Sequence, residues 1–253
     1  MAKKIAIVNQ KGGVGKSTTA VNFSASLAEK GNKVLLIDID PQGNASSGLG
    51  INKSEVEDTI YDLLIEAEPA VKAILKTEAQ NLDLIPANIE LAGAEIELVS
   101  LMSRESRLEK SLIKINPAYD YIIIDCPPSL GLLTLNALTA ADSVIVPIQC
   151  EYYALEGLGQ LMNTIDLVRK NLNPDLRIEG VLMTMYDART NLSQQVIDEV
   201  KEYFSELVFK TVIPRNVRLS EAPSFGQTIL AYSSKSKGAL AYRKLAEEVI
   251  ALD

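Results

Sequence analysis

The sequence contains no histidine among its 253 residues, and this absence restricts the chemistry that the protein can perform. Without histidine there can be no Ser-His-Asp or Cys-His nucleophilic site, no zinc site with imidazole ligands and no imidazole general base. Any reaction must therefore depend on carboxylates, lysines, arginines, backbone amides and a metal ion.

Cysteine and long apolar runs are also scarce. Cys126 and Cys150 are far apart and form no CxxC pair, so we expect two small apolar side chains in a reducing compartment. No apolar run is long enough to span a bilayer. The first predicted strand begins at Ile5, which leaves no room for a signal peptide. These features predict a cytoplasmic protein that does not use the membrane as a partner.

The charge balance is acidic, with 33 Asp and Glu against 25 Lys and Arg and a net charge of −8. Taken alone, this balance argues against a nucleic-acid partner. Net charge does not report a local basic patch, however, so the question depends on individual residues. The hydrophobic fraction of 47% is sufficient to cover both faces of a sheet.

Buried-strand patterns alternate with helical patterns along the whole chain. We expect strands at 5–8, 33–37, 82–85, 121–124, 143–147, 178–183 and 207–213, and helices at 17–30, 59–67, 70–76, 90–115, 132–140, 154–170, 193–204 and 239–252. The helix at 90–115 could break near 100–106, and 44–50 is expected to be a loop. The alternation predicts one α/β domain over 1–253, a doubly wound, mostly parallel sheet with helices on both faces.

The segment 4–19, KIAIVNQKGGVGKSTT, has the parts of a phosphate-binding loop. A buried strand leads into a glycine-rich loop and then into a helix. Glycines allow the backbone to direct its N–H groups at a phosphate, and the helix N-terminus adds positive potential. Lys16 would neutralise phosphate oxygens, and the Ser17 hydroxyl would ligate Mg²⁺. The predicted nucleotide-binding residues here are Lys11, Gly12, Gly13, Val14, Gly15, Lys16, Ser17 and Thr18.

Carboxylates follow two of the predicted strands. Asp38 and Asp40 come after the second strand, and Asp125 ends the apolar run 121–124 in the Walker B pattern. The carboxyl ends of parallel strands form one edge, where ligands bind. We therefore expect Asp125 and Ser17 at the magnesium ion and the other two carboxylates close by. The prolines at 127–128 stiffen a loop that could sense a γ-phosphate.

These motifs resemble those of the ParA/MinD family of ATPases, because K-G-G-V-G-K-S carries the second lysine, Lys11, of the deviant Walker A motif. The resemblance to the ParA/Soj members covers nearly the whole chain, through QKGGVGKST, LIDIDPQGN, YIIIDCPPSLG, PIQCEYYALEGL, MYDARTN and IPRNVRLSEAPS. It implies a Mg²⁺-dependent ATPase in which Asp40 positions the attacking water. It also implies that Lys11 reaches across an ATP-dependent sandwich dimer to the partner's phosphates, and that Pro214 and Asn216 line the adenine. Residues 184–187 could form the other wall of the base pocket.

The same resemblance implies a function in segregating DNA. Proteins of this type bind non-specific double-stranded DNA on the nucleoid, and a ParB/Spo0J-type partner stimulates their ATP hydrolysis. The matching basic residues are Arg189, Arg215 and Arg218, with Lys235, Lys237 and Arg243 further along the chain. Arginine suits this role because its guanidinium matches the geometry of a phosphate.

Two alternatives have different sequence requirements. A MinD-like membrane switch would need a basic amphipathic helix at the C-terminus, whereas 244–253 is acidic. An electron carrier like the nitrogenase reductase would bridge an iron–sulfur cluster with two cysteines per subunit. The neighbours of Cys126 and Cys150 lack the glycine-rich pattern of such ligands, so the partitioning ATPase is the preferred hypothesis.

Overall fold

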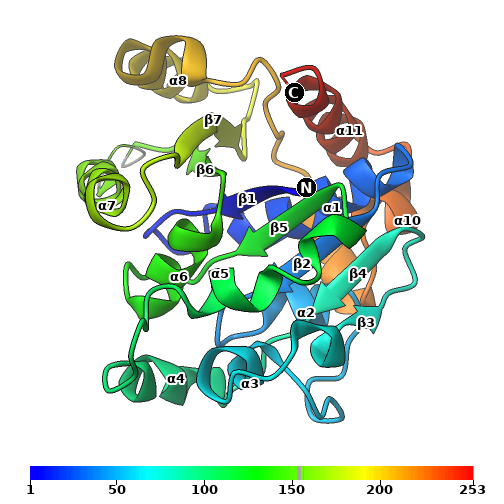
Figure 1. The fold of residues 1–253 in the computed structure, drawn as a ribbon. Coiled ribbons are helices and arrows are strands. Elements are labelled where there is room, and N and C mark those ends of the chain that lie inside the picture. The colour runs from blue at the N-terminus through cyan, green and yellow to red at the C-terminus, as the bar shows by residue number, and fades with distance from the viewer. Residues whose placement is uncertain (153–154, 156, 253) are drawn as a thin grey trace.

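The computed structural model describes residues 1–152, 155 and 157–252. Within them one seven-stranded sheet runs in the order β3-β4-β2-β5-β1-β6-β7 (Figure 1). Neighbouring strands are parallel except for the pair β3 and β4, which confirms the predicted mostly parallel sheet. The strands are β1 (Lys3–Ile7), β2 (Val34–Asp38), β3 (Leu75–Lys76), β4 (Leu82–Ile85), β5 (Tyr121–Asp125), β6 (Ser143–Gln149) and β7 (Arg177–Thr184).

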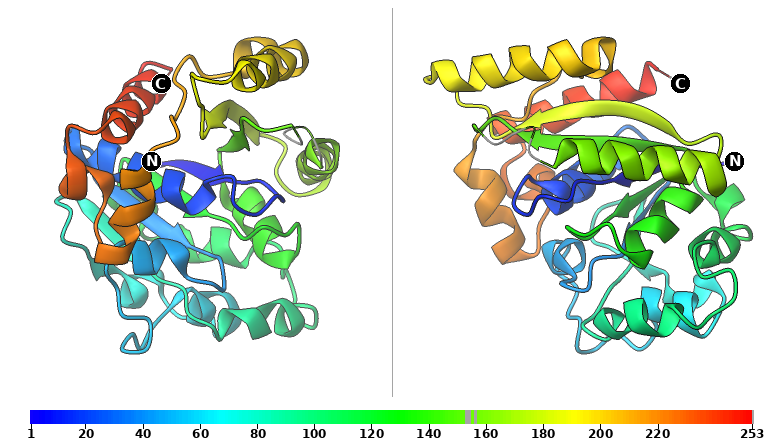
Figure 2. Two further views of the ribbon diagram at one scale, coloured as in Figure 1. Left: turned by 180° about the vertical axis from the view of Figure 1, so that it is seen from behind. Right: turned by 90° about the vertical axis from the view of Figure 1, so that its left-hand side faces the viewer.

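Helices cover both faces of this sheet (Figures 1 and 2). The α-helices are α1 (Lys16–Glu29), α2 (Asn44–Gly48), α3 (Ile60–Ile65), α4 (Leu91–Leu98), α5 (Arg107–Leu112), α6 (Leu132–Ala140), α7 (Leu158–Asn171), α8 (Asn191–Phe204), α9 (Val217–Glu221), α10 (Ile229–Ser233) and α11 (Lys237–Ile250). Single 3₁₀ turns are η1 (Ala70–Ala73), η2 (Asn116–Ala118), η3 (Ser205–Leu207) and η4 (Ala222–Phe225).

Two hydrophobic cores lie on opposite faces of the sheet, because successive side chains of a strand point in opposite directions. From β1, Ile5 and Ile7 enter the core shared with α1 and α11, whereas Ala6 and Val8, the residue just after the strand, enter the core shared with α3 to α8. All four side chains are fully buried. The continuous apolar runs of the sequence are explained by this burial on both sides.

The predicted loop at 44–50 is wrong, because residues 44–48 form helix α2. Gly43 adopts a left-handed conformation with φ 59°, which turns the chain into the helix. The buried carboxylate of Asp38 then accepts hydrogen bonds from the backbone N–H and the hydroxyl of Ser46, both at 2.8 Å. A tertiary contact with a buried acid therefore folds a stretch whose local composition is typical of a loop.

The predicted helix at 70–76 is also wrong. It stops after η1, and Leu75 and Lys76 pair antiparallel with β4 as the edge strand β3. The Lys76 ammonium lies 2.7 Å from the Asp83 carboxylate on β4. Cross-strand pairing with this acid overrides the local helical preference.

The predicted strand at 207–213 does not form, although this segment lies beside β7. It touches β7 through an isolated bridge between Val208 and Val181, and a second isolated bridge joins Pro214, just after the segment, to Tyr186, just after β7. Between them, the N–H groups of Lys210 and Thr211 donate instead to the carboxylate of Glu248 on α11, at 2.7 and 2.9 Å. These two N–H groups are therefore not available for a continuous hydrogen-bond ladder with β7.

The remaining boundaries differ from the predictions by a few residues. The pattern at 90–115 divides into α4 and α5, so the expected break is confirmed. The predicted helix start at Ala154 lies outside the described residues, and α7 begins at Leu158.

Candidate functional site

The glycine-rich loop lies between β1 and α1, at the carboxyl edge of the sheet. Gly13 and Gly15 have φ angles of 75° and 90°, a left-handed conformation that favours glycine. Gly15 immediately precedes the first turn of α1, so unpaired N–H groups of that helix face the loop. The loop lines a cavity of about 450 Å³ with Gly12, Gly13, Gly15, Lys16, Ser17 and Thr18. Of the predicted loop residues, Lys11 and Val14 do not line the cavity, and the Val14 carbonyl accepts a hydrogen bond from the Thr184 hydroxyl at 2.8 Å.

Lys16 is the buried cation of this cavity. Its side chain is only 6% exposed, and its ammonium donates to the carbonyl of Lys11 at 3.1 Å. Burial lowers the pKa of Lys16, while the nearby Asp125, Cys126 and Asp40 raise it. The lysine is therefore held among acidic groups in a partly desolvated place, where an anionic ligand would interact with it strongly.

Asp38 and Asp40 have different surroundings, although they are two residues apart. Asp38 is fully buried and accepts from Ser46 and from the N–H of Asp40 at 3.2 Å, so its oxygens are used within the protein. Burial is the main cause that raises the pKa of Asp38 to about 6, and the Ser46 hydrogen bonds oppose it. Asp40 lines the cavity, with one oxygen accepting from the N–H of Gln42 at 2.9 Å. Asp40 is therefore the carboxylate that faces a ligand.

Asp125 lies at the end of β5, directly beside Asp38 on β2. Both of its carboxylate oxygens are buried, and none of the described residues donates to them with good hydrogen-bond geometry, although the Ser17 side chain is close enough to act on the carboxylate. Burial and then the charge of Asp38 raise the pKa of Asp125 well above its usual value, while Ser17 and Lys16 lower it. A buried acid without donors is costly unless a cation is near. The pair of Asp125 and Ser17 therefore fits a divalent ion with oxygen ligands.

Further lining of the cavity comes from the chain beyond β7 and from η4 with the residues after it. Pro223 in η4 and Gln227 just after it line the cavity, together with Met185 beyond β7. Met185 lies within the predicted wall at 184–187 and has a left-handed φ of 53°, a strained conformation for a non-glycine residue. Pro223 lies in the segment IPRNVRLSEAPS that carries part of the family resemblance, but neither Pro223 nor Gln227 was predicted as a site residue, and only the folded chain brings them to the cavity of the glycine loop.

Pro214 and Asn216 do not belong to the lining of this cavity. Pro214 forms a bridge with Tyr186, and the Asn216 side chain caps α9 by accepting from the N–H of Arg218 at 2.9 Å. Their contact with adenine stays a prediction.

The three predicted DNA-binding arginines are exposed and each is paired with a nearby acid. Arg189 donates to both oxygens of Asp187, at 2.9 and 2.7 Å. Arg215 lies 3.0 Å from Glu151, and the third arginine lies 2.9 Å from Glu221. Arg189 and then Arg215 hold the pKa of Asp187 well below its usual value, so these two arginines share one neighbourhood. Arg243 is different, because Glu29 on α1 holds it against the protein surface.

The two cysteines are both buried. Cys126 is fully buried and Cys150 is 4% exposed, and burial raises the pKa of each thiol. Neither thiol is placed to bridge two subunits through a cluster, which supports their interpretation as apolar side chains.

A close backbone contact fixes the wall that carries Pro223 and Gln227. A Cβ added to Gly226, whose φ is 64°, would lie 2.6 Å from the Cα of Gly50. Gly226→Ala should therefore cost about 2 kcal/mol of stability, a drop of about 4–8 °C in melting temperature, and weaken nucleotide binding. Calorimetry and nucleotide titration would measure both effects.

Gly159→Ala is the matched control. Gly159 lies in α7, and a Cβ added to it would meet open space. The melting temperature of the Gly159→Ala variant should therefore stay the same or rise slightly. Equal melting temperatures and nucleotide affinities for the two variants would contradict the role given to the contact between Gly50 and Gly226.

Comparison with known proteins agrees with the geometry of this site. A family model for an AAA domain matches residues 2–178. The chain is 64% identical to the sporulation initiation inhibitor protein Soj of Bacillus subtilis, over 99% of each sequence. It is 56% identical to the chromosome partitioning protein ParA of Myxococcus xanthus, covering 98% of this chain and 88% of that protein. Among solved structures, a protein of Mycobacterium smegmatis described as cobyrinic acid a,c-diamide synthase, with bound ADP and magnesium, has a TM-score of 0.88. It is 42% identical over 99% of this chain and 94% of that one.

Proposed function

Because the chain belongs to the Soj/ParA family of chromosome-partitioning ATPases, we propose that ATP joins two copies of it into a dimer that binds DNA. The protein is an ATPase that uses ATP and Mg²⁺. The observation that best supports an ATP switch is that Lys16 and Asp40 line one cavity, with the buried carboxylate of Asp125 close enough to act on the charge of Lys16. We propose that the whole chain acts as one ATPase domain in the cytoplasm, on the nucleoid.

Each side chain in the cavity has a proposed role in the reaction. The loop amides and Lys16 would hold the β- and γ-phosphates, while Ser17 and Asp125 would hold Mg²⁺, whose charge would neutralise those phosphates. Asp40 orients the attacking water at the edge of the cavity. Lys11 lies at the start of the glycine loop, half-buried, and in the dimer its ammonium would reach the phosphates of the other subunit. Pro128 lines the same cavity, so the loop after β5 is placed to respond to the γ-phosphate.

Binding of non-specific double-stranded DNA is proposed to use Arg189, Arg215 and Arg218. Their ion pairs lie at the surface, and such pairs contribute only about 0–1 kcal/mol each. An arginine can therefore exchange its carboxylate partner for a DNA phosphate at little cost in free energy. A single subunit with net charge −8 offers few such contacts, but a dimer doubles them, which would couple DNA affinity to ATP binding. A ParB/Spo0J-type partner is proposed to stimulate hydrolysis and release the dimer.

The alternative of a MinD-like membrane switch has weaker support. The C-terminal helix α11 buries Tyr242, Leu245 and Val249 against the core that it shares with α1, so its apolar face is already covered. None of the helices in the described part of the chain has the length and apolar character needed to cross a membrane. The surface available at α11 does not favour insertion into lipid.

The test is sedimentation with ATP, with ADP and without nucleotide, each with and without non-specific duplex DNA. We expect a dimer that sediments with DNA only when ATP is present. Arg218→Glu should still form the dimer. Removal of one phosphate contact per subunit should make the negative slope of log affinity against log salt shallower by about 2.

Lys72→Glu is the control for this charge reversal, because Lys72 is an exposed lysine in a similar pair, 2.7 Å from Glu68. Its dimer should bind DNA as the unaltered protein does. A monomer in all three nucleotide conditions would overturn the proposed switch, and equal DNA retention by Arg218→Glu would overturn the arginine patch.

A further inference from the structure

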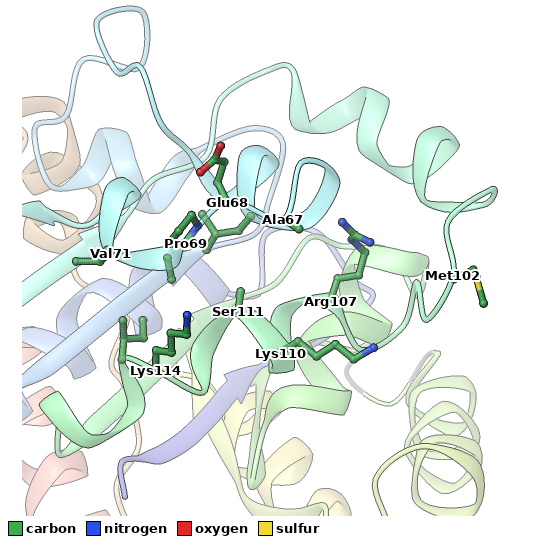
Figure 3. Close-up of a pocket in the computed structure, with 12 residues that line it drawn as sticks. Ala67, Glu68, Pro69, Val71, Met102, Arg107, Lys110, Ser111 and Lys114 are labelled. Carbon is green, nitrogen blue, oxygen red and sulfur yellow. The ribbon is translucent and has the colours of Figure 1, made fainter.

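A second cavity, of about 270 Å³, lies between α5 and the segment 67–71 that follows α3 (Figure 3). It shares no lining residue with the nucleotide cavity. Its floor is apolar and buried, formed by Leu63, Ala70 and Ile115. Two large apolar side chains at the lining are instead exposed, Val71 at 65% and Met102 at 91%. An apolar hollow with exposed apolar residues around it is typical of a contact site for another molecule.

The wall formed by α5 and the turn after it is cationic. Arg107, Lys110 and Ser111 line the cavity from one face of α5, because residues spaced by three and four lie on one face of a helix, and Lys114 lines it from the turn that follows. Arg107 is fixed by hydrogen bonds to the carbonyls of Leu64 and Ile65 at the end of α3, the second of them 3.0 Å long. Figure 3 shows Arg107, Lys110 and Lys114 side by side along this wall.

The charges at the mouth of the cavity are not balanced. Among the described residues, no carboxylate forms a salt bridge with Lys110 or Lys114. The lining acid Glu68 is already paired with Lys72 at 2.7 Å. A region of positive charge therefore persists beside an apolar hollow, on a protein whose net charge is −8.

We propose that this cavity binds an acidic segment of a partner protein, with one apolar side chain of that segment inserted into the hollow. The volume is slightly below the roughly 300–1,000 Å³ of ordinary small-molecule pockets, and suits an anchoring side chain better than a cofactor. The exposed Val71 and Met102 extend the apolar contact beyond the hollow. Lys110 and Lys114 would face Asp or Glu residues that flank the inserted side chain, which gives charge complementarity and faster association.

Fluorescence anisotropy with three labelled peptides tests this site on the full chain. The first is a 12-residue peptide of alternating Glu and Leu, the second has Lys in place of Glu, and the third has Ser in place of Leu. We expect the first to bind at least about tenfold more tightly than the others, with affinity that falls as salt rises. The double variant Lys110→Glu and Lys114→Glu should weaken this binding at least about tenfold.

Two further variants keep the test specific. Lys201→Glu on α8 reverses an exposed lysine away from the cavity and should bind the first peptide as the unaltered protein does. Ser111→Phe places a ring in the hollow and should abolish binding. ATP affinity should be the same in all of these variants, so the outcome here and that of the DNA experiment are independent.

Several outcomes would overturn the assignment. These are absence of binding by the first peptide, equal binding of the basic or the serine peptide, and unchanged binding in the double variant. Displacement of the peptide by octanoate at a similar concentration would also overturn it, because an apolar carboxylate without a peptide backbone would then satisfy the cavity. That result would identify a small-molecule site.

Discussion

Lys16→Ala is expected to lower the affinity for ATP by about 100-fold or more. Lys16 is the buried ammonium of the glycine-loop cavity, and hydrogen bonds from a charged group are worth about 1.5–3 kcal/mol each. Loss of two such bonds to the phosphates corresponds to at least a 100-fold change in dissociation constant. Titration with a fluorescent ATP analogue would measure the dissociation constant, and thermal unfolding would check that the variant is folded.

Lys11→Ala is the informative comparison, because both lysines lie in the same loop. The Lys11 carbonyl, which the substitution keeps, accepts the hydrogen bond from Lys16. The variant should therefore keep an ATP affinity within about threefold of the original in the monomer, while ATP-dependent dimerisation is lost. Unchanged ATP affinity in Lys16→Ala would refute the assignment of the loop, whereas a dimer formed by Lys11→Ala would refute only the contact across subunits.

The parts of the fold that could be predicted from sequence are those decided by burial on both faces of a strand. The runs around Ile5, Ile123 and Val144 are apolar without interruption, and each forms a central strand. The glycine loop was equally predictable, because its conformation requires φ angles that glycine adopts readily. Local chemistry and the final structure agree at these places.

The errors occur where a distant polar group decides the backbone conformation. Helix α2 depends on Asp38, and β3 is accompanied by the contact between Lys76 and Asp83. The segment at 207–213 lacks a regular ladder because Glu248 on α11 takes two of its amides. In each case the partner lies seven or more residues away, outside the range of a local pattern.

The site shows the same division. Lys16, Ser17, Asp40 and Asp125 follow from strand ends and from the motif, whereas Pro223 and Gln227 reach the cavity only because η4 and the start of α10 are tied to α1. Asn22 on α1 makes this tie, since its carbonyl oxygen accepts from the N–H of Ile229 at 2.7 Å. The ion pairs of the exposed arginines were likewise not predictable, because each depends on how loops meet at the surface.

Asp40→Ala is expected to keep ATP affinity nearly unchanged and to lower the hydrolysis rate by about 100-fold or more. The Asp40 carboxylate faces the cavity and makes one hydrogen bond, to the N–H of Gln42, so its removal disturbs little of the fold. Loss of the group that positions a reacting water costs about 10²-fold in rate. ATP would then persist in the dimer, and the variant should accumulate on DNA. Phosphate release and retention on DNA measure the two effects.

Asp38→Ala separates this chemical role from a structural one. Asp38 is fully buried and accepts two hydrogen bonds from Ser46, so its loss leaves buried donors without partners and should lower the melting temperature. Asp40→Ala should melt close to the unaltered protein. If Asp40→Ala hydrolysed ATP at the original rate, the water would have to be oriented by another group at the cavity. If it melted as early as Asp38→Ala, its slow hydrolysis would reflect loss of structure, and the assignment of Asp40 to the reaction would fail.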